Sequence, residues 1–223
     1  MSSRYEVRYV MPPGWRRMPP VTRALLVLLA AGYLVTLAWP LAAAWLALAP
    51  APVLAGQVWR LVTYAVVDTS IVSLLFALLL TWSLGSELEP SWGSRRYALF
   101  LLVATVVAGA LGLLVGGGAG FTPTLLALIF AWMFEGPSRP LSFFGVLPMT
   151  RLGFALLSLV LVVFSDLQAT RYLPRLLFVL GGLPVSWLFA RGGRGKPRLP
   201  RIRNPFARRR FTVVGSGDDF RVH

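Results

Sequence analysis

Long apolar runs, separated by short polar or proline-containing stretches, dominate the chain. Six runs stand out, at residues 21–39, 69–85, 97–115, 122–134, 151–164 and 173–190. A helix needs about 20 apolar residues to cross the hydrocarbon core of a bilayer, and most of the runs approach that length. The pattern therefore predicts an all-α polytopic membrane protein, a bundle of six transmembrane helices.

The fourth run differs from the others because it is short and follows a glycine-rich turn. Glycines occupy 116–118 and 120, and the apolar run at 122–134 is too short to cross a bilayer as a straight helix. Short helices that begin after glycine in membrane proteins tend to start inside the protein, beside a cavity. We expect a short central fourth helix next to such a cavity.

The composition is typical of a membrane protein and excludes several kinds of functional site. Hydrophobic residues make up 57% of the chain and the mean hydropathy is +0.70, whereas a soluble domain is about half apolar. The chain has no cysteine, which excludes a disulfide framework, a thiolate metal site and a cysteine nucleophile. Its one histidine is His223, the last residue of the sequence.

The net charge of +14 is concentrated near the two ends of the chain. Ten of the 22 basic residues lie from Arg191 onward, and five lie in the first 23 residues. A basic tail beside a membrane span fixes orientation and contacts anionic lipid more often than it binds nucleic acid. The expected partners are the lipid bilayer and anionic lipid at the basic tails, with no nucleic acid.

The same charges predict the organisation of the chain. We expect a cytoplasmic tail at 1–20, a six-span membrane domain at 21–190 and a basic cytoplasmic tail at 191–223. In this topology the outer loops hold only Arg60, Arg171 and Arg175, so both termini are expected in the cytoplasm. A cleaved secretory signal is an alternative for the first run, but five further runs follow it.

Two connecting segments carry the most distinctive residues. The loop at 40–68 is partly apolar and holds Trp59-Arg60, an interfacial anchor by composition alone. In the turn after the second run, Pro90 and Gly93 restrict and bend the chain. This turn predicts an ion pair of Glu89 with Arg95 or Arg96.

Taken in order, these motifs resemble the rhomboid superfamily of intramembrane proteases and its non-proteolytic relatives, including the derlins. The resemblance covers roughly residues 20–190 and rests on Trp59-Arg60, Leu88-Glu89, Gly93 and Arg95 or Arg96 around one apolar span. It implies a rhomboid-like bundle with a partly embedded first loop. It also implies that Arg60 is a structural clamp, donating hydrogen bonds to carbonyl groups of that loop.

The resemblance locates the two positions that hold the catalytic dyad in the proteases. The family's Gly-x-Ser-Gly aligns with 120–123, placing Thr122 at the serine, and an alternative register places Gly120 there. The family's Ala-His-x-Gly-Gly aligns with 178–182 and places Val179 at the histidine. Pro123 stands where the family has glycine and lacks a backbone N–H that could hold an oxyanion.

Small residues near these positions are expected to pack helices closely around the cavity. Small residues spaced four apart let membrane helices approach each other. The glycines assigned to cavity and packing are Gly112, Gly116, Gly118, Gly120, Gly181 and Gly182.

No other residue replaces the missing dyad. The acidic residues of the membrane domain fall at the predicted ends of spans, where we expect water to solvate them, and no metal site or cofactor is expected. The sequence thus predicts a rhomboid-like pseudoprotease that binds transmembrane segments of client proteins, in the inner membrane of a bacterium. The alternatives are an active protease with a Thr122 nucleophile and a structural or lipid-organising membrane protein.

Overall fold

A computed structural model describes residues 18–68, 70–135, 141–143, 147–170 and 172–192. The tails expected at 1–20 and 191–223 lie almost entirely outside the described residues.

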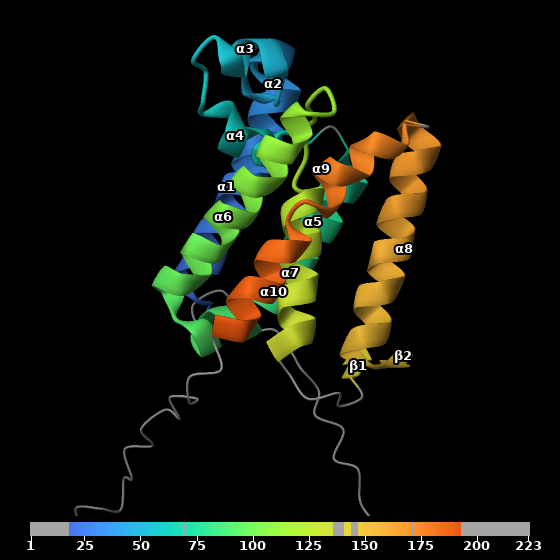
Figure 1. Cartoon of the computed structure of the whole chain (residues 1–223). Coiled ribbons are helices and arrows are strands. Elements are labelled where there is room, and N and C mark those ends of the chain that lie inside the picture. The colour runs from blue at the N-terminus through green and yellow to red at the C-terminus, as the bar shows by residue number, and fades with distance from the viewer. Residues whose placement is uncertain (1–17, 69, 136–140, 144–146, 171, 193–223) are drawn as a thin grey trace, which may run out of the picture.

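The described chain is an α-helical membrane bundle (Figure 1). Five helical stretches are long and apolar enough to cross a membrane, namely α1 (Pro20–Ala38), α5 (Ile71–Trp92), α6 (Ser94–Leu113), α8 (Arg151–Thr170) and the broken unit formed by η3 (Leu173–Arg175), α9 (Leu176–Leu180) and α10 (Leu183–Gly192). The shorter apolar helix α7 (Thr122–Glu135) is the fourth of the six. The polytopic all-α fold with a short fourth helix is confirmed.

Prolines and glycines set the boundaries of the helices. Helix α1 begins with Pro20 and ends where Trp39 becomes extended, because a residue before proline is disfavoured in the helical region. Helix α5 runs through Pro90 to Trp92, and Gly93 alone, at φ +83°, separates it from α6. The predicted ends of these spans, at 85 and 97, are therefore wrong, since the charged turn is almost wholly helical.

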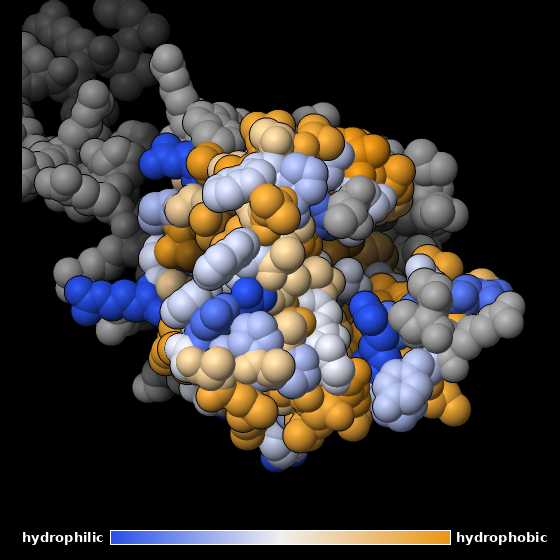
Figure 2. All heavy atoms as spheres, turned by 90° about the horizontal axis from the view of Figure 1, so that it is seen from above, coloured by the Kyte–Doolittle hydropathy of each residue, from blue (hydrophilic) through white to orange (hydrophobic). Residues whose placement is uncertain are grey.

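The segment between α1 and α5 folds into four short helical pieces at one end of the bundle (Figure 1). They are α2 (Pro40–Leu46), α3 (Pro50–Leu54), α4 (Arg60–Thr63) and η2 (Tyr64–Val66). We call this the loop end. Seen from it, apolar residues form much of the rim, and more polar residues gather toward the middle (Figure 2).

At the opposite end, here called the tail end, α1 and α8 begin. The antiparallel strands β1 (Leu141–Phe143) and β2 (Leu147–Met149) lie beside the start of α8 (Figure 1).

Helix α7 lies at the centre of the bundle and α8 lies at its edge. Helix α7 packs against α5, α6, α8, α9 and α10, and residues such as Leu126, Leu128 and Ile129 are buried. Helix α8 packs mainly along α7 and against α9, and Ala155 is the one buried residue among its described side chains. The space that opens between α5 and α8 contains the candidate site.

Candidate functional site: a cavity between α5, α7, α8 and α9

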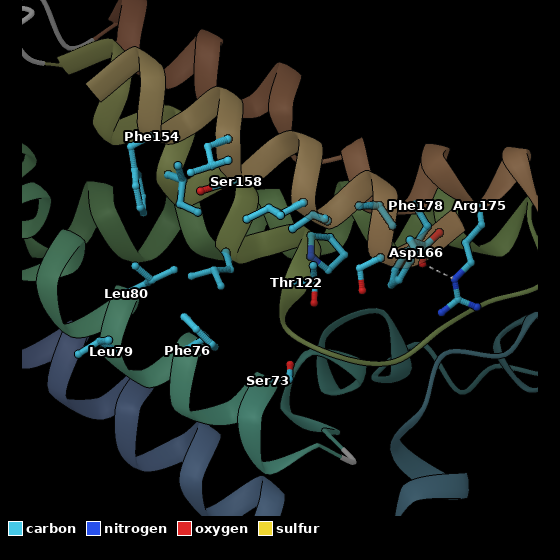
Figure 3. A pocket seen from close by; sticks show the side chains of 18 of the residues that line it. Ser73, Phe76, Leu79, Leu80, Thr122, Phe154, Ser158, Asp166, Arg175 and Phe178 are labelled. Carbon is cyan, nitrogen blue, oxygen red and sulfur yellow. Dashed lines mark hydrogen bonds and ion pairs between the residues drawn. The ribbon is translucent and has the colours of Figure 1, made fainter. Parts of the chain in front are cut away.

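A cavity of about 730 Å³ lies between the central helix α7 and the peripheral helix α8 (Figure 3). Helix α5 forms the facing wall, and α9 closes the loop end. Its apolar lining residues include Phe76, Leu79, Leu80, Ile129, Phe154, Leu157 and Leu161. Phe76, Leu157 and Leu161 remain 59%, 44% and 57% exposed, so the cavity opens sideways, toward the surroundings of the bundle.

The polarity of the cavity changes along its length. Toward the tail end its walls are almost wholly apolar, apart from Ser158, whereas toward the loop end Ser73, Thr122, Asp166 and Arg175 gather (Figure 3). Asp166 Oδ1 accepts a hydrogen bond from Arg175 Nε at 3.1 Å, and this ion pair joins α8 to η3. The cavity is therefore amphipathic, with its charged groups at one end.

The two positions that the sequence resemblance assigns to the catalytic dyad both line this cavity. Thr122 is the first residue of α7, and Val179 lies on α9. The Thr122 hydroxyl makes no hydrogen bond to another described residue. Helix packing thus brings the two positions to one space, although neither side chain is the family's catalytic residue.

Asp166 is the cavity residue that sequence reasoning missed. The fifth span was predicted to end at Phe164, which left Asp166 in a solvated exit. In the structure α8 continues to Thr170, so Asp166 lies on the same helical face as Val162. The spacing of four residues between these two was a signal that could have placed it.

The start of α7 is fixed by the loop end of the bundle. Leu48 and Gly118 exchange two backbone hydrogen bonds, at 2.9 and 3.0 Å, and Gly120 N donates to Tyr64 O at 2.9 Å. Gly120 adopts φ +107°, a conformation that residues with a Cβ rarely take. The loop at 40–68 therefore sets where Thr122 enters the cavity.

Comparisons with known proteins agree with this architecture. A family model described as "Eukaryotic integral membrane protein (DUF1751)" matches residues 23–118. The chain is 33% identical over 126 residues to the Rhomboid protease GlpG homolog of Cronobacter sakazakii, an alignment that covers 54% of this chain and 45% of that protein. It is 28% identical over 116 residues to Rhomboid protease GlpG of Yersinia pestis, covering 50% and 40% respectively.

The chain is thus similar to rhomboid-superfamily proteins over about half of its length. It spans less than half the length of the curated relatives that it matches.

Glycines allow the helices of this rhomboid-like chain to close around the cavity. A Cβ at Gly112 or Gly118 would meet the Phe178 ring at 2.6–2.7 Å. One at Gly181 would meet Ala108 Cα at 2.9 Å, and one at Gly182 would meet Ala127 Cβ at 2.8 Å. Gly116 serves the turn instead, with φ +93° and open space around it.

Arg60 holds the loop at 40–68 together. Its Nη1 donates to Ala44 O and Ala47 O, both at 2.7 Å, and its Nε donates to Gln57 Oε1 at 2.8 Å. The residue is 5% exposed, whereas the neighbouring Trp59 is 48% exposed. The guanidinium thus lies inside the loop while the indole faces outward.

The predicted ion pair of Glu89 with Arg95 or Arg96 is wrong, and so is its predicted solvation. Glu89 is 1% exposed. Its oxygens accept hydrogen bonds from Val21 N at 3.0 Å, Thr22 N at 2.7 Å, Thr22 Oγ1 at 2.9 Å and Ser94 Oγ at 2.7 Å. Helix α1 has no side-chain cap of its own, so the Glu89 carboxylate satisfies its first N–H groups.

The two arginines of this region have other surroundings. Arg95 is exposed. Arg96 donates to Phe189 O on α10, and its guanidinium lies over the Trp92 ring, 5.1 Å from the centroid. Arg96 therefore ties the start of α6 to α10 instead of closing the turn at Gly93.

A second charged cluster holds the tail end of α8. Arg151 pairs with Glu87 of α5, and its guanidinium lies 4.4 Å from the centroid of the Trp132 ring of α7. Trp132 Nε1 donates to Glu87 Oε2 at 2.5 Å. Polar contacts thus fix α8 near both of its ends, with the apolar part of the cavity between them.

Proposed function

We propose that this rhomboid-like chain is a pseudoprotease that binds transmembrane segments of client proteins without cleaving them. The observation that carries the proposal is the cavity itself: the two dyad positions line it, yet they hold Thr122 and Val179. By the sequence resemblance, a threonine and a valine stand in this cavity where the proteases carry serine and histidine, and this supports binding without cleavage.

The chemistry of acyl transfer supports a non-catalytic role. A hydroxyl becomes a nucleophile when a base within hydrogen-bond reach takes its proton. The valine side chain at 179 accepts no proton. Pro123, at the position of the family's glycine, offers no N–H to an oxyanion.

The shape of the cavity supports an apolar helical partner. Its lateral walls on α5 and α8 are lined by exposed apolar side chains, which suit a segment that arrives through the bilayer. Helix α8 contacts the bundle chiefly through α7 and α9 and is joined to α5 by the Arg151–Glu87 pair at the tail end, so a segment can approach between α5 and α8 beyond that pair.

Photo-crosslinking tests client binding. A photoreactive residue at Leu161, inside the cavity, should crosslink to intact transmembrane segments when the full chain is co-expressed with a panel of them. The matched control is the same residue at Leu99, which is 53% exposed on α6 and lies outside the cavity lining. Equal crosslinking from both positions would contradict the proposal and favour a structural or lipid-organising protein.

Active proteolysis is the second candidate, because one acidic side chain, Asp166, shares the cavity with Thr122. Its Oδ1 is engaged by Arg175, which argues against a free proton acceptor. We expect no cleavage and no reaction with a fluorophosphonate probe. Cleavage of a client by the unmodified chain that disappears in Thr122→Ala would establish the protease instead.

Restoring the dyad is the sensitive form of this test. Thr122→Ser alone should remain inactive, because a primary hydroxyl is no better without a proton acceptor. Thr122→Ser with Val179→His should give at most trace cleavage, since general base assistance is worth ~10²–10⁴-fold and Pro123 still removes an N–H.

We also propose that both termini lie in the cytoplasm of a bacterium and that the basic tails contact anionic lipid. The distribution of arginine supports this orientation. Reporter fusions at 18 and 205 should report the cytoplasm, and a fusion at 168 should report the outer side. Opposite locations for the two termini would contradict the topology.

A further inference from the structure

The charged end of the cavity presents one side chain to an incoming partner more than the other. In the ion pair, the side chain of Arg175 is 33% exposed and that of Asp166 is 14% exposed. Arginine carries five N–H donors, and Asp166 uses the one on Nε. The Nη groups of Arg175 donate to no other described residue.

Arg175 is the more accessible of the two charged side chains that line the cavity. The other ionisable residue that lines the cavity is Asp166, and the remaining polar lining consists of the hydroxyls of Ser73, Thr122, Ser158 and Ser165. A carboxylate that arrives beside Arg175 would receive charge-assisted hydrogen bonds from a fixed pair of nitrogens.

The hydroxyls indicate that the partner of this charge is a polypeptide rather than a lipid. Ser158 lies farther into the cavity than Arg175, among apolar side chains, and Thr122 lies between the two (Figure 3). In a lipid bound through its phosphate, the ester carbonyls follow directly after the phosphate, and the acyl chain that would reach Ser158 offers no hydrogen-bonding group. A peptide backbone offers carbonyl and N–H groups all along its length.

From this geometry we infer that the cavity selects transmembrane segments that carry an aspartate or glutamate at the end that lies nearest the loop end of the bundle. Arg175 binds that carboxylate. The inference rests on the proposed client binding and names the chemical class of the client. The apolar part of the segment would lie against Phe76 and Leu157, with its acidic residue at the polar end.

The test compares designed segments that differ at one position. Each has an apolar core and carries Asp, Asn or Lys at its loop-end boundary, and crosslinking is measured from a photoreactive residue at 161. We expect the Asp segment to crosslink about fivefold to tenfold more than the Asn segment, and the Lys segment least. Moving the Asp to the tail end of the segment should abolish its advantage.

Variants of the Asp166–Arg175 ion pair test whether Arg175 is the residue that binds the client carboxylate. Arg175→Gln should remove the difference between the Asp and Asn segments while leaving the Asn signal in place. Asp166→Asn should enlarge the difference, because the guanidinium then has no resident carboxylate. The double variant, Asp166→Asn with Arg175→Gln, leaves no unpaired charge and should behave like Arg175→Gln. The control Arg191→Gln, an exposed arginine over Trp187 on α10, should change nothing.

The outcomes distinguish failure of the charge selection from failure of the proposed client binding. Equal crosslinking of all three segments at 161 overturns the charge selection and leaves client binding standing. No crosslinking of any segment overturns both. If phosphatidylglycerol in proteoliposomes suppresses every segment equally, and Arg175→Gln relieves that suppression, the guanidinium binds lipid phosphate and the inference is wrong.

Discussion

The side of the bundle formed by α1, α5 and α6 and the side formed by α8 use charged groups in opposite ways. Glu89 and Arg60 are 1% and 5% exposed, and each makes several hydrogen bonds within the fold. The two ion pairs that hold α8 are more open: Arg151 and Asp166 on α8 are 13% and 14% exposed, and their partners Glu87 and Arg175 are 38% and 33% exposed. Of the most apolar 18 residues in each helix, 44% are buried in α6 and 6% in α8.

This difference separates charged groups that stabilise the fold from charged groups that the proposed client could contact. A buried charge with every hydrogen bond satisfied stabilises the fold, because removing it leaves its partners unpaired in a poorly hydrated place. A partly exposed pair contributes little to stability, but it remains available to a partner. Substitutions on the two sides should therefore have unequal costs.

The largest effect is expected at Glu89. Glu89→Ala leaves the first N–H groups of α1 and the hydroxyls of Thr22 and Ser94 without their acceptor. We expect the free energy of unfolding to fall by about 3–5 kcal/mol, measured by thermal unfolding in detergent. Glu87→Ala, at a half-exposed carboxylate, is the matched control and should cost less; equal losses would remove the distinction between the two sides.

Arg60 should follow at the loop end. Arg60→Ala leaves the carbonyl groups of Ala44 and Ala47 unpaired, for an expected loss of about 2–3 kcal/mol in the same assay. Arg60→Lys should lose less, because lysine keeps a charge but not the planar fork. Arg95→Ala is the exposed control. An Arg60→Ala protein as stable as that control would show that the loop needs no clamp.

Close packing of α10 against α7 should give an intermediate effect. In Gly182→Ala the new methyl group meets Ala127 Cβ at 2.8 Å and Pro123 O at 3.0 Å, so backbone must move. The expected loss is about 1–3 kcal/mol. At Gly192 the nearest atom is Arg96 Nη2 at 3.6 Å, and Gly192→Ala should be neutral. A neutral Gly182→Ala would mean that α10 can shift away from α7 freely.

The smallest effect is expected on α8. Leu161 is 57% exposed, so Leu161→Ala should change the free energy of unfolding by no more than about 0.5 kcal/mol. The same change at Leu128, which is 0% exposed on α7, should cost about 2–5 kcal/mol. A large loss at Leu161 would indicate that α8 is packed in solution and that the cavity is closed.

The sequence alone determined the parts of this protein that depend on composition along one segment. Apolar length fixed α1 closely, since 21–39 was predicted and Pro20–Ala38 is observed. The short fourth helix could likewise be predicted from the sequence, because a glycine turn and a short apolar run are both local features. The rhomboid resemblance of the motifs agrees with the comparisons for the same reason, since it depends on residue order.

Tertiary structure decided which side chains meet. The sequence paired Glu89 with its nearest arginines, whereas the fold brings it to the start of α1, 67 and 68 residues away in the chain. It also turned Asp166 from a solvated exit residue into part of a cavity that holds Thr122 and Val179. Hydrogen bonds and cavities arise between segments that are distant in sequence, and helix packing alone determines which polar groups are buried together.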